Sequence, residues 1–433
     1  MASVARNLQL PLLILSVFAL LGATCTAMPS QRIGGTVSVI GSWSGPEEEA
    51  FRSVVAPFEE QTGITVEYRG TRDLDGVLWE GIARGRVPDV AGLPGPGHMA
   101  DFAREGALQD LTQIIDIAQY KSDTVPAFVE LGTIDGRLVG VFIKATLKGL
   151  VWYNPNIYTL EEPETWAELQ ALGLLAARGD TELWCVALES GATSGWPATD
   201  WIEDFLLRQS GPDVYDDWVA GTLPWTSAEV RSAFEAYGEV IGDSFGDAPT
   251  VLATNFIDGG RPLFTEPPGC LFHHQGTFMT EFFRSRAGAR AGEYDFFPFP
   301  PIDERFANSV TGAGDLFGVF NDTPQARALM QYLLTPEAQT LWVERGGALS
   351  VNRRVTEYPD PISRRAAEVL SSADRFRFDA SDLMPETMNA AFLQGVIDYT
   401  QEPQRLDEVL ESLDVTRLRA YSGDVLTQPQ GPP

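Results

Sequence analysis

Hydrophobic residues along the chain alternate between two spacings, and this alternation predicts an α/β protein. Residues 36–40 (TVSVI) and 64–68 (ITVEY) place apolar side chains at every second position, which is typical of strands. Between them, the apolar residues of 51–58 (FRSVVAPF) recur every third or fourth position, as on one face of a helix. Such a helix can cross between parallel strands. The same rhythm continues through residues 75–178, so we expect an α/β architecture.

Prolines change the pattern later in the chain. Residues 295–301 (DFFPFPP) are predicted to be a crossing segment, because proline cannot donate a hydrogen bond within a central strand. Residues 324–334 are predicted to form a helix. A second helix should follow, with Thr335 as its N-cap and Pro336 at its first position.

The first 27 residues have the pattern of a secretory signal. Arg6 supplies a positive charge, and the almost entirely apolar run 10–21 is too short to span a membrane. Either Cys25 becomes the lipid-modified cysteine of a lipoprotein, or the signal is removed after Ala27. The sequence leaves both open. In either case we expect an exported protein that is periplasmic or held at the cell surface.

Length and charge narrow the class of protein. A chain of 433 residues exceeds the size of one hydrophobic core, so two domains are expected. The chain has 60 acidic and 31 basic residues and a net charge of −29. Its densest basic pairs are Arg353-Arg354 and Arg364-Arg365, whereas a nucleic-acid partner requires larger basic clusters. Nucleic acid is therefore excluded as a partner, and a neutral polyol fits better than an anion.

The pairing of the cysteines also depends on whether the protein is exported. Once Cys25 is set aside, Cys185 and Cys270 remain as an even pair. In an oxidising compartment we expect them to form one disulfide, and two separate buried thiols are the alternative.

Several segments, in this order, resemble the extracellular solute-binding proteins of ABC sugar importers, above all the α-glucoside and maltose-binding branch. The matching segments are GSWSG (41–45), PDVAGLPGPG (88–97), the run from IDGRL to PNIY (134–158), SGWPATDWIED (194–204), SVTGAGDLFGVF (309–320) and YLLTPEAQTLWVERGG with ALSVNR (332–353).

The resemblance implies a periplasmic-binding-protein-like fold, in which two α/β lobes joined by a three-crossing hinge close on a ligand. The N-terminal lobe would comprise 36–143 and 312–346, and the C-terminal lobe 148–308 and 350–421, with a tail at 422–433. The resemblance also implies a monomer without cofactor, which binds a carbohydrate and delivers it to the membrane permease subunits of an ABC importer.

A sugar offers ring faces that pack on aromatic planes and hydroxyls that bind carboxylates, amides and lysines. Trp43 follows the first strand, at the end where α/β folds bind ligands. Trp196 and Asp200 combine an indole with a carboxylate within one short segment. The predicted ligand-binding residues are Trp43, Glu47, Asp89, Lys144, Trp196, Asp200, Trp201, Gln275, Gly314, Asp315 and Phe392.

Each candidate also has a structural interpretation. The aromatic side chains could pack in a core, the carboxylates could bind backbone amides, and Lys144 could pair with a structural acid. For Asp89 and Phe392 we favour the structural interpretation.

The sequence gives little support for catalysis or for metal binding. His273 and His274 face opposite ways if they lie on a strand, and no further ligand follows at zinc spacing. The sequence contains no nucleophile elbow, HExxH pair or P-loop, so we expect no enzyme. Two alternatives stay open: a secreted carbohydrate-active hydrolase, which would need a pair of catalytic carboxyls, and the same fold binding a polyamine or other small solute.

Overall fold

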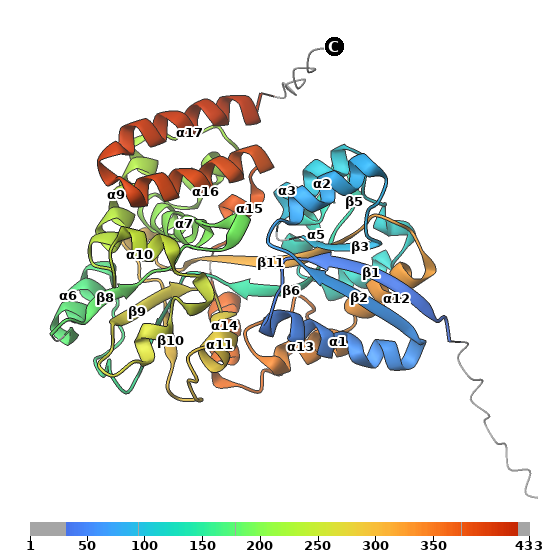
Figure 1. Cartoon of the computed structure of the whole chain (residues 1–433), viewed down its shortest axis with the longest axis horizontal. Coiled ribbons are helices and arrows are strands. Elements are labelled where there is room, and N and C mark those ends of the chain that lie inside the picture. The colour runs from blue at the N-terminus through green and yellow to red at the C-terminus, as the bar shows by residue number, and fades with distance from the viewer. Residues whose placement is uncertain (1–31, 94, 178, 374, 423–433) are drawn as a thin grey trace, which may run out of the picture.

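The computed structural model describes residues 32–422 except 94, 178 and 374. The predicted signal segment, with Cys25, lies outside the described residues, as do residues 423–433 of the predicted tail. Figure 1 shows two bodies of strands and helices, with β6 (Val141–Leu147) and β11 (Ser309–Val319) extending between them. None of the described helices is long and apolar enough to span a membrane.

The first body is built on a six-stranded sheet. Its strand order is β12-β11-β3-β1-β2, and β6 also pairs with β11. Strand β1 is parallel to β2 and β3, whereas β11 is antiparallel to β3 and β6. The remaining strands of this sheet are β1 (Gly35–Gly41), β2 (Ile64–Gly70), β3 (Val90–Leu93) and β12 (Arg375–Phe378).

Helices cover this sheet, and a short hairpin lies beside it (Figure 1). The helices are α1 (Pro46–Thr62), α2 (Leu74–Arg84), α3 (Pro96–Arg104), α4 (Ile117–Asp123), α5 (Pro126–Leu131), α12 (Pro324–Leu333) and α13 (Pro336–Arg345). The hairpin strands are β4 (Thr133–Ile134) and β5 (Arg137–Leu138). The predicted opening unit is confirmed: Pro46 begins α1, Gly63 ends it with φ of 70°, and the stripe of Phe51, Val54, Val55 and Phe58 is buried.

The second body has a four-stranded sheet of order β10-β7-β9-β8. Its strands are β7 (Leu150–Tyr153), β8 (Glu182–Cys185), β9 (Cys270–Gln275) and β10 (Asp295–Pro298). The prediction of a crossing segment at 295–301 was wrong: residues 295–298 form β10, antiparallel to β7. Because β10 lies at the edge of the sheet, its proline leaves no central hydrogen bond unmade.

Ten helices of the described chain surround this sheet and its connections. They are α6 (Trp166–Ala176), α7 (Trp196–Ser210), α8 (Pro212–Val219), α9 (Ala228–Gly242), α10 (Ala248–Ala253), α11 (Met279–Ser285), α14 (Pro361–Ser372), α15 (Ala380–Leu383), α16 (Glu386–Gln401) and α17 (Leu406–Ala420).

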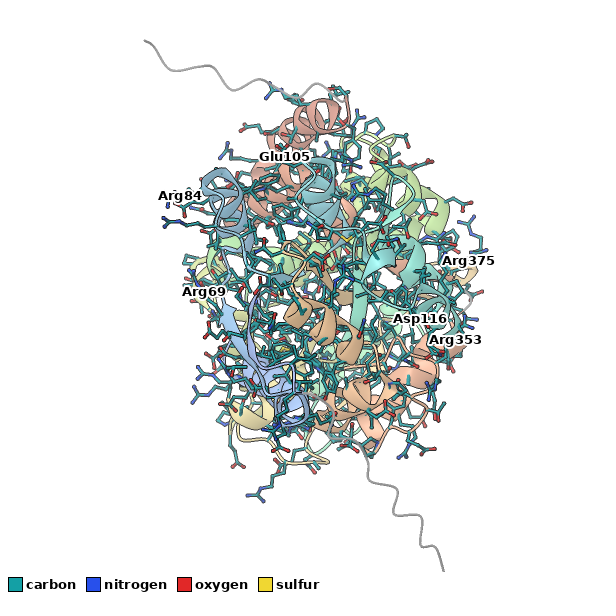
Figure 2. All side chains as sticks on the ribbon, turned by 90° about the vertical axis from the view of Figure 1, so that its right-hand side faces the viewer. Arg69, Arg84, Glu105, Asp116, Arg353 and Arg375 are labelled. Atoms are coloured by element: carbon teal, nitrogen blue, oxygen red, sulfur yellow. A yellow bond between two sulfur atoms is a disulfide. The ribbon has the colours of Figure 1, made fainter. Side chains whose placement is uncertain are left out.

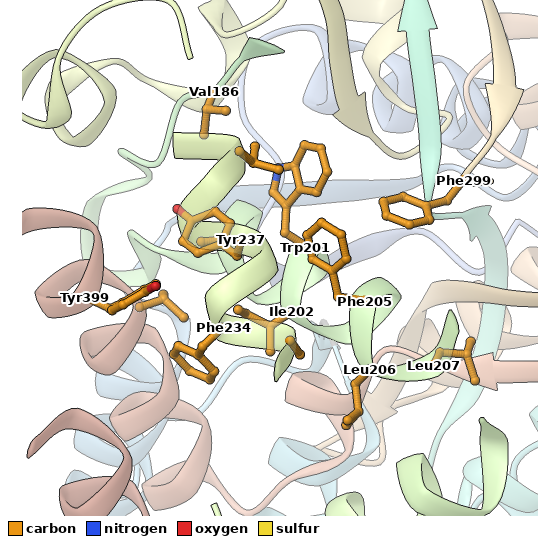
Figure 3. Packing of buried hydrophobic residues seen from close by; sticks show 14 of the residues in the cluster. Val186, Trp201, Ile202, Phe205, Leu206, Leu207, Phe234, Tyr237, Phe299 and Tyr399 are labelled. Atoms are coloured by element: carbon orange, nitrogen blue, oxygen red, sulfur yellow. The ribbon is translucent and has the colours of Figure 1, made fainter. Parts of the chain in front are cut away.

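Helix α7 is the centre of the core of this body. Figure 3 shows Trp201 and Phe205 of α7 on the side of Phe299, and Ile202 of α7 beside Phe234 of α9. Most of α7 is buried, polar residues included, because other elements surround it. The surrounding elements therefore fix the position of α7, and its first residue, Trp196, packs against Phe256 and Phe278.

Charged side chains cover the outside. Figure 2 shows Arg69 and Arg84 at one edge of the face and Arg353 and Arg375 at the other, all pointing outward. Of the basic pair Arg353-Arg354, Arg354 forms an ion pair with Asp123 at 3.4 Å.

Cys185 and Cys270 form a disulfide, so the paired interpretation is confirmed. Cys185 ends β8 and Cys270 begins β9, and these two strands are parallel neighbours in the sheet. The Cα atoms are 5.5 Å apart, and the link closes a long loop with a sequence separation of 85.

Replacing both cysteines, Cys185→Ala with Cys270→Ala, should lower the free energy of unfolding by about 4–5 kcal/mol, the chain-entropy value for a loop of this length. Denaturant titration of the oxidised wild type and the double variant measures the difference. Wild type treated with a reductant is the control and should match the variant. Equal stability of all three samples would contradict the prediction.

Candidate ligand-binding site

A cavity of about 180 Å³ lies between the two bodies and is lined from both. The lining is rich in charged and aromatic side chains. The acidic residues are Glu47, Asp75, Asp315, Asp379 and Asp382; the basic ones are Arg72, His98, Lys144 and Lys148; the aromatic ones are Trp43, Trp196, Phe256 and Phe278. The size suits a small ligand, since cavities for drug-sized ligands hold about 300–1,000 Å³.

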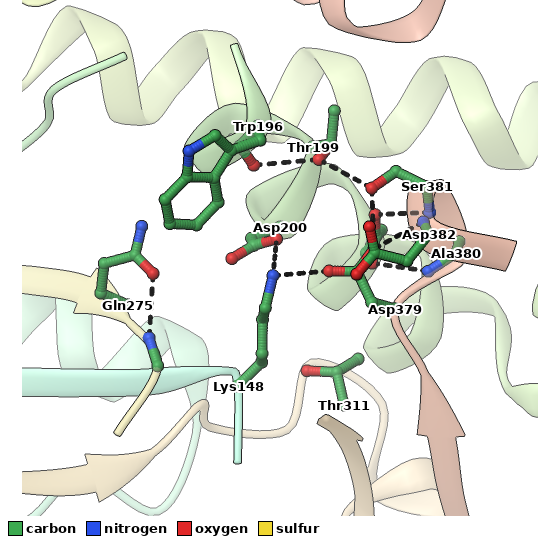
Figure 4. Close-up of polar contacts among 12 residues, drawn as sticks. Lys148, Trp196, Thr199, Asp200, Gln275, Thr311, Asp379, Ala380, Ser381 and Asp382 are labelled. Carbon is green, nitrogen blue, oxygen red and sulfur yellow. Dashed lines mark hydrogen bonds and ion pairs between the residues drawn. The ribbon is translucent and has the colours of Figure 1, made fainter. Parts of the chain in front are cut away.

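Lys148, directly after β6, binds two buried carboxylates (Figure 4). Its Nζ atom lies 2.8 Å from Oδ1 of Asp200 and 2.5 Å from Oδ2 of Asp379. Asp200 is the fifth residue of α7, and Asp379 is the N-cap of α15. The ammonium also lies 5.0 Å from the ring centre of Trp196, a cation–π contact. Lys148 thus connects the strand between the bodies to two elements beside the cavity.

Ionisation in this group follows from the pairing. Burial opposes the charge of Lys148, but Asp200 and Asp379 outweigh it and raise the pKa of the lysine well above its usual value. Burial also acts against ionised Asp379, but Lys148 and the hydrogen bonds from Ser381 and from the backbone of Asp382 lower the pKa of Asp379 overall. For Asp200, burial prevails and raises the pKa.

Glu203 completes the acidic group behind the cavity. It accepts hydrogen bonds from the backbone nitrogens of Ala380 (2.9 Å) and Ser381 (3.1 Å). Oxygens of Glu203, Asp200 and Asp379 lie within 4.8 Å of one another, close enough to share a cation. The ammonium of Lys148 is in contact with two of these carboxylates, so the cation in this group is a side chain.

Lys144, on β6, is held by three residues of the first body. Its Nζ atom lies 3.2 Å from Oδ2 of Asp315 and 4.8 Å and 5.1 Å from the ring centres of Trp43 and Trp342. The indole nitrogen of Trp43 donates to Oδ1 of Asp315 at 3.1 Å. Trp43 is only 3% exposed, so it supports this group more than it offers a free ring face.

Two further pairs complete the lining. Arg72 lies 3.6 Å from Glu47 and 4.9 Å from the ring centre of Phe256, which belongs to the other body. Burial raises the pKa of Glu47, although Lys144 and Arg72 oppose this shift. His98 lies 2.8 Å from Oδ2 of Asp75.

Six of the residues predicted from the sequence line the cavity, and a seventh lies directly behind it. The six are Trp43, Glu47, Lys144, Trp196, Gly314 and Asp315. Asp200 is not among the lining residues, but it binds Lys148, which is.

The structure places the other four predicted residues elsewhere. Asp89 accepts hydrogen bonds at 2.9 Å from the backbone and hydroxyl of Ser38. Trp201 packs in the core with its ring 4.2 Å from that of His274. Phe392 is fully buried. Gln275 is buried, and its Oε1 accepts from the backbone of Gly276 (Figure 4). Their side chains fill structural positions rather than the cavity wall.

The sequence interpretation missed several lining residues. Arg72 follows the second parallel strand, so the rule that pointed to Trp43 after the first strand could have found it. Lys148 lies in the predicted crossing, where only Lys144 was chosen. Asp379 and Asp382 gave no local signal beyond that of a helix cap.

Two sheets with a polar cavity between them define a solute-binding protein of the two-lobed kind. The chain belongs to the bacterial extracellular solute-binding proteins, whose family profile matches residues 43–340.

Two relatives share 38% identity with this chain. The osmoprotective compounds-binding protein GgtB of Synechocystis sp. aligns over 373 residues, 84% of this chain and 88% of its own. The alpha-glucosides-binding periplasmic protein AglE of Rhizobium meliloti aligns over 386 residues, 84% of this chain and 83% of its own.

Solved structures share the fold at low identity. A chitin oligosaccharide binding protein has a TM-score of 0.78 at 18% identity, covering 90% of this chain and 100% of its own. Maltose-bound MalE3 of T. maritima has a TM-score of 0.68 at 18% identity, covering 89% and 99%. The predicted fold class and family are thereby confirmed.

His98 should make stability depend on pH. Burial disfavours its charge, but the hydrogen bond and charge of Asp75 outweigh burial and raise the pKa of His98 from 6.5 to about 9. A raised pKa stabilises the folded state fully below the unfolded value, and this contribution is lost as the pH rises through the folded value. The difference in unfolding free energy between wild type and His98→Gln should therefore fall by roughly 3 kcal/mol from about pH 6 to about pH 10. Denaturant titrations across this range measure it, and a constant difference would contradict the prediction.

Lys148→Met should destabilise the fold by about 3–5 kcal/mol, because it leaves Asp200 and Asp379 buried without their cation. Thermal and denaturant unfolding measure the loss. A matched control neutralises the lysine together with both of its carboxylate partners, Lys148→Met with Asp200→Asn and Asp379→Asn, and should recover much of the stability. A single variant as stable as wild type would refute the role assigned to the ion pairs.

Proposed function

We propose that the protein is the substrate-binding component of an ABC importer, and that it captures a small neutral solute rich in hydroxyl groups, an α-glucoside in the first place. In this proposal it is exported, acts as a monomer and delivers its ligand to membrane permease subunits without chemical turnover.

The pairing of charges inside the cavity carries this proposal. Four of the five lining carboxylates face a cationic partner: Asp379 with Lys148, Asp315 with Lys144, Glu47 with Arg72, and Asp75 with His98. Burial and the neighbouring Asp379 raise the pKa of the fifth, Asp382, well above its usual value, which favours its neutral form. A polyamine would need unpaired carboxylates, whereas hydroxyls can bind oxygens and nitrogens that are already paired.

An aromatic corner provides the complementary surface. The ring of Trp196 meets those of Phe256 at 5.0 Å and Phe278 at 5.9 Å, both edge-on. Apolar ring faces at one side of the cavity suit the C–H face of a sugar. The names of GgtB and AglE, which refer to osmoprotective compounds and alpha-glucosides, agree with a small polar solute.

Lobe closure completes the proposal. We assign 36–143 with 312–346 to one lobe and 148–308 with 350–421 to the other. Strand β12, which the second assignment includes, pairs with Ser309–Gly312 at the beginning of β11, where this strand enters the hinge. Strand β6 supports this hinge, because it pairs with β11 on one side and Ala145 exchanges backbone hydrogen bonds of 2.7 and 2.8 Å with Leu349 on the other. The pairing of these three segments side by side supports a hinge made of three chain crossings.

A thermal-shift screen tests the ligand class. Trehalose, maltose and sucrose should include a sugar that raises the melting temperature, because a ligand at a hundred times its Kd adds about 2.7 kcal/mol. Spermidine and sulfate should have no effect. Stabilisation by spermidine alone would overturn the proposal, and release of glucose from the bound sugar would favour the hydrolase.

Trp196→Ala should weaken binding of the stabilising sugar about tenfold, because the sugar loses its aromatic platform. Isothermal titration calorimetry measures the change. Phe245→Ala is the control, since Phe245 is 43% exposed and is not among the lining residues. Equal affinity of the two variants would place the sugar away from Trp196.

A further inference from the structure

One wall of the cavity is a seam between the two bodies, formed by residues 95–104 on one side and 380–389 on the other. Helix α3 packs there against α15 and the start of α16 (Figure 1). His98 reaches the cavity from one side of this seam, and Asp382 from the other. Closing the seam therefore closes the cavity.

Two glycines allow the close approach. A Cβ atom on Gly95 would lie closer than 3.0 Å to the carbonyl oxygen of Asp382, and one on Gly97 equally close to that of Met384. Neither position needs glycine for its backbone, since φ of Gly95 is −149° and Gly97 lies within helix α3, where alanine is favourable. The missing side chains make room for the other body.

Two hydrogen bonds cross the seam and meet at Glu386. The indole nitrogen of Trp79 donates to Oε2 of Glu386, and the backbone nitrogen of Glu386 donates to Oδ2 of Asp101, both at 3.1 Å. Glu386 begins α16, and Pro385 before it offers no side-chain cap. Asp101 therefore caps α16 from the opposite body, where an anion is favoured by the helix end.

We propose that this seam holds the lobes closed over a bound ligand, and that Gly97 and Asp101 set ligand affinity as positioning residues outside the cavity. The proposal rests on the proposed function, because it assigns the seam to ligand capture. Neither residue is among those described as lining the cavity. Any free energy by which the seam stabilises the closed form also strengthens ligand binding, since the ligand favours that form.

Gly97→Ala tests the close approach, and Gly242→Ala is its matched control. Gly242 ends α9, and a Cβ there would meet nothing within 4 Å. Gly97→Ala should raise the Kd for maltose and trehalose about tenfold or more. It should also speed amide hydrogen exchange of residues 380–390 in ligand-free protein, without lowering the melting temperature. Gly242→Ala should change none of these values.

A second pair of variants tests the cap. Asp101→Asn keeps an acceptor oxygen and should retain most of the affinity, whereas Asp101→Ala should weaken sugar binding about tenfold. If Gly97→Ala has both the sugar affinity and the amide hydrogen exchange of wild type, the role proposed for the seam is refuted. If wild type binds neither maltose nor trehalose, the proposed binding of these two sugars is refuted. Even then, amide hydrogen exchange in the ligand-free variants shows whether the seam holds the lobes together.

Discussion

The ammonium group of Lys148 is the interaction on which the cavity depends. It binds Asp200 and Asp379, and so fixes the end of β6 to the start of α7 and to the cap of α15. Two buried carboxylates lose their hydration on folding, as does the lysine. Their mutual contact offsets that loss, together with the hydrogen bonds that Asp379 accepts from Ser381 and from the backbone of Asp382. Removing the lysine alone leaves both carboxylates buried without their cation. Because α15 is held in this way, it can form both a cavity wall and one side of the seam.

The elements that could be predicted are those whose signals lie within a few residues. Pro46 and Gly63 bound α1 as expected, and the hydroxyl of Thr335 accepts from the backbone of Ala338 as an N-cap. Strand β10 was missed because its place at a sheet edge depends on pairing with β7, more than a hundred residues earlier. A proline excludes a central strand, but only the order of the whole sheet shows which strand lies at an edge.

The site could be predicted only in part, again because the sequence shows only those signals that lie within a few residues. Trp43 could be found because the ends of parallel strands meet at one edge. Asp379 could not be found in this way, since its partner Lys148 is 231 positions away and no local sequence pattern connects the two. Trp201 lies in the core, although Trp196, five residues earlier, lines the cavity. Because α7 is buried on nearly all sides, the aromatic residues of this one helix meet different surroundings. Helical periodicity cannot distinguish the cavity side of such a helix from its core side.

Strand β6 joins the two halves of the site through its alternation. Lys144, Thr146 and Lys148 line the cavity, whereas Ala145 and Leu147 between them pack in the core. One cation pairs with Asp315 of the first body, and the other reaches the carboxylates beside α7 and α15. A shift of one residue in register would turn both lysines into the apolar core and leave the carboxylates unpaired. The same register thus positions the hinge and keeps the cavity close to neutral, so the preference for an uncharged ligand and the closure of the lobes have one physical origin.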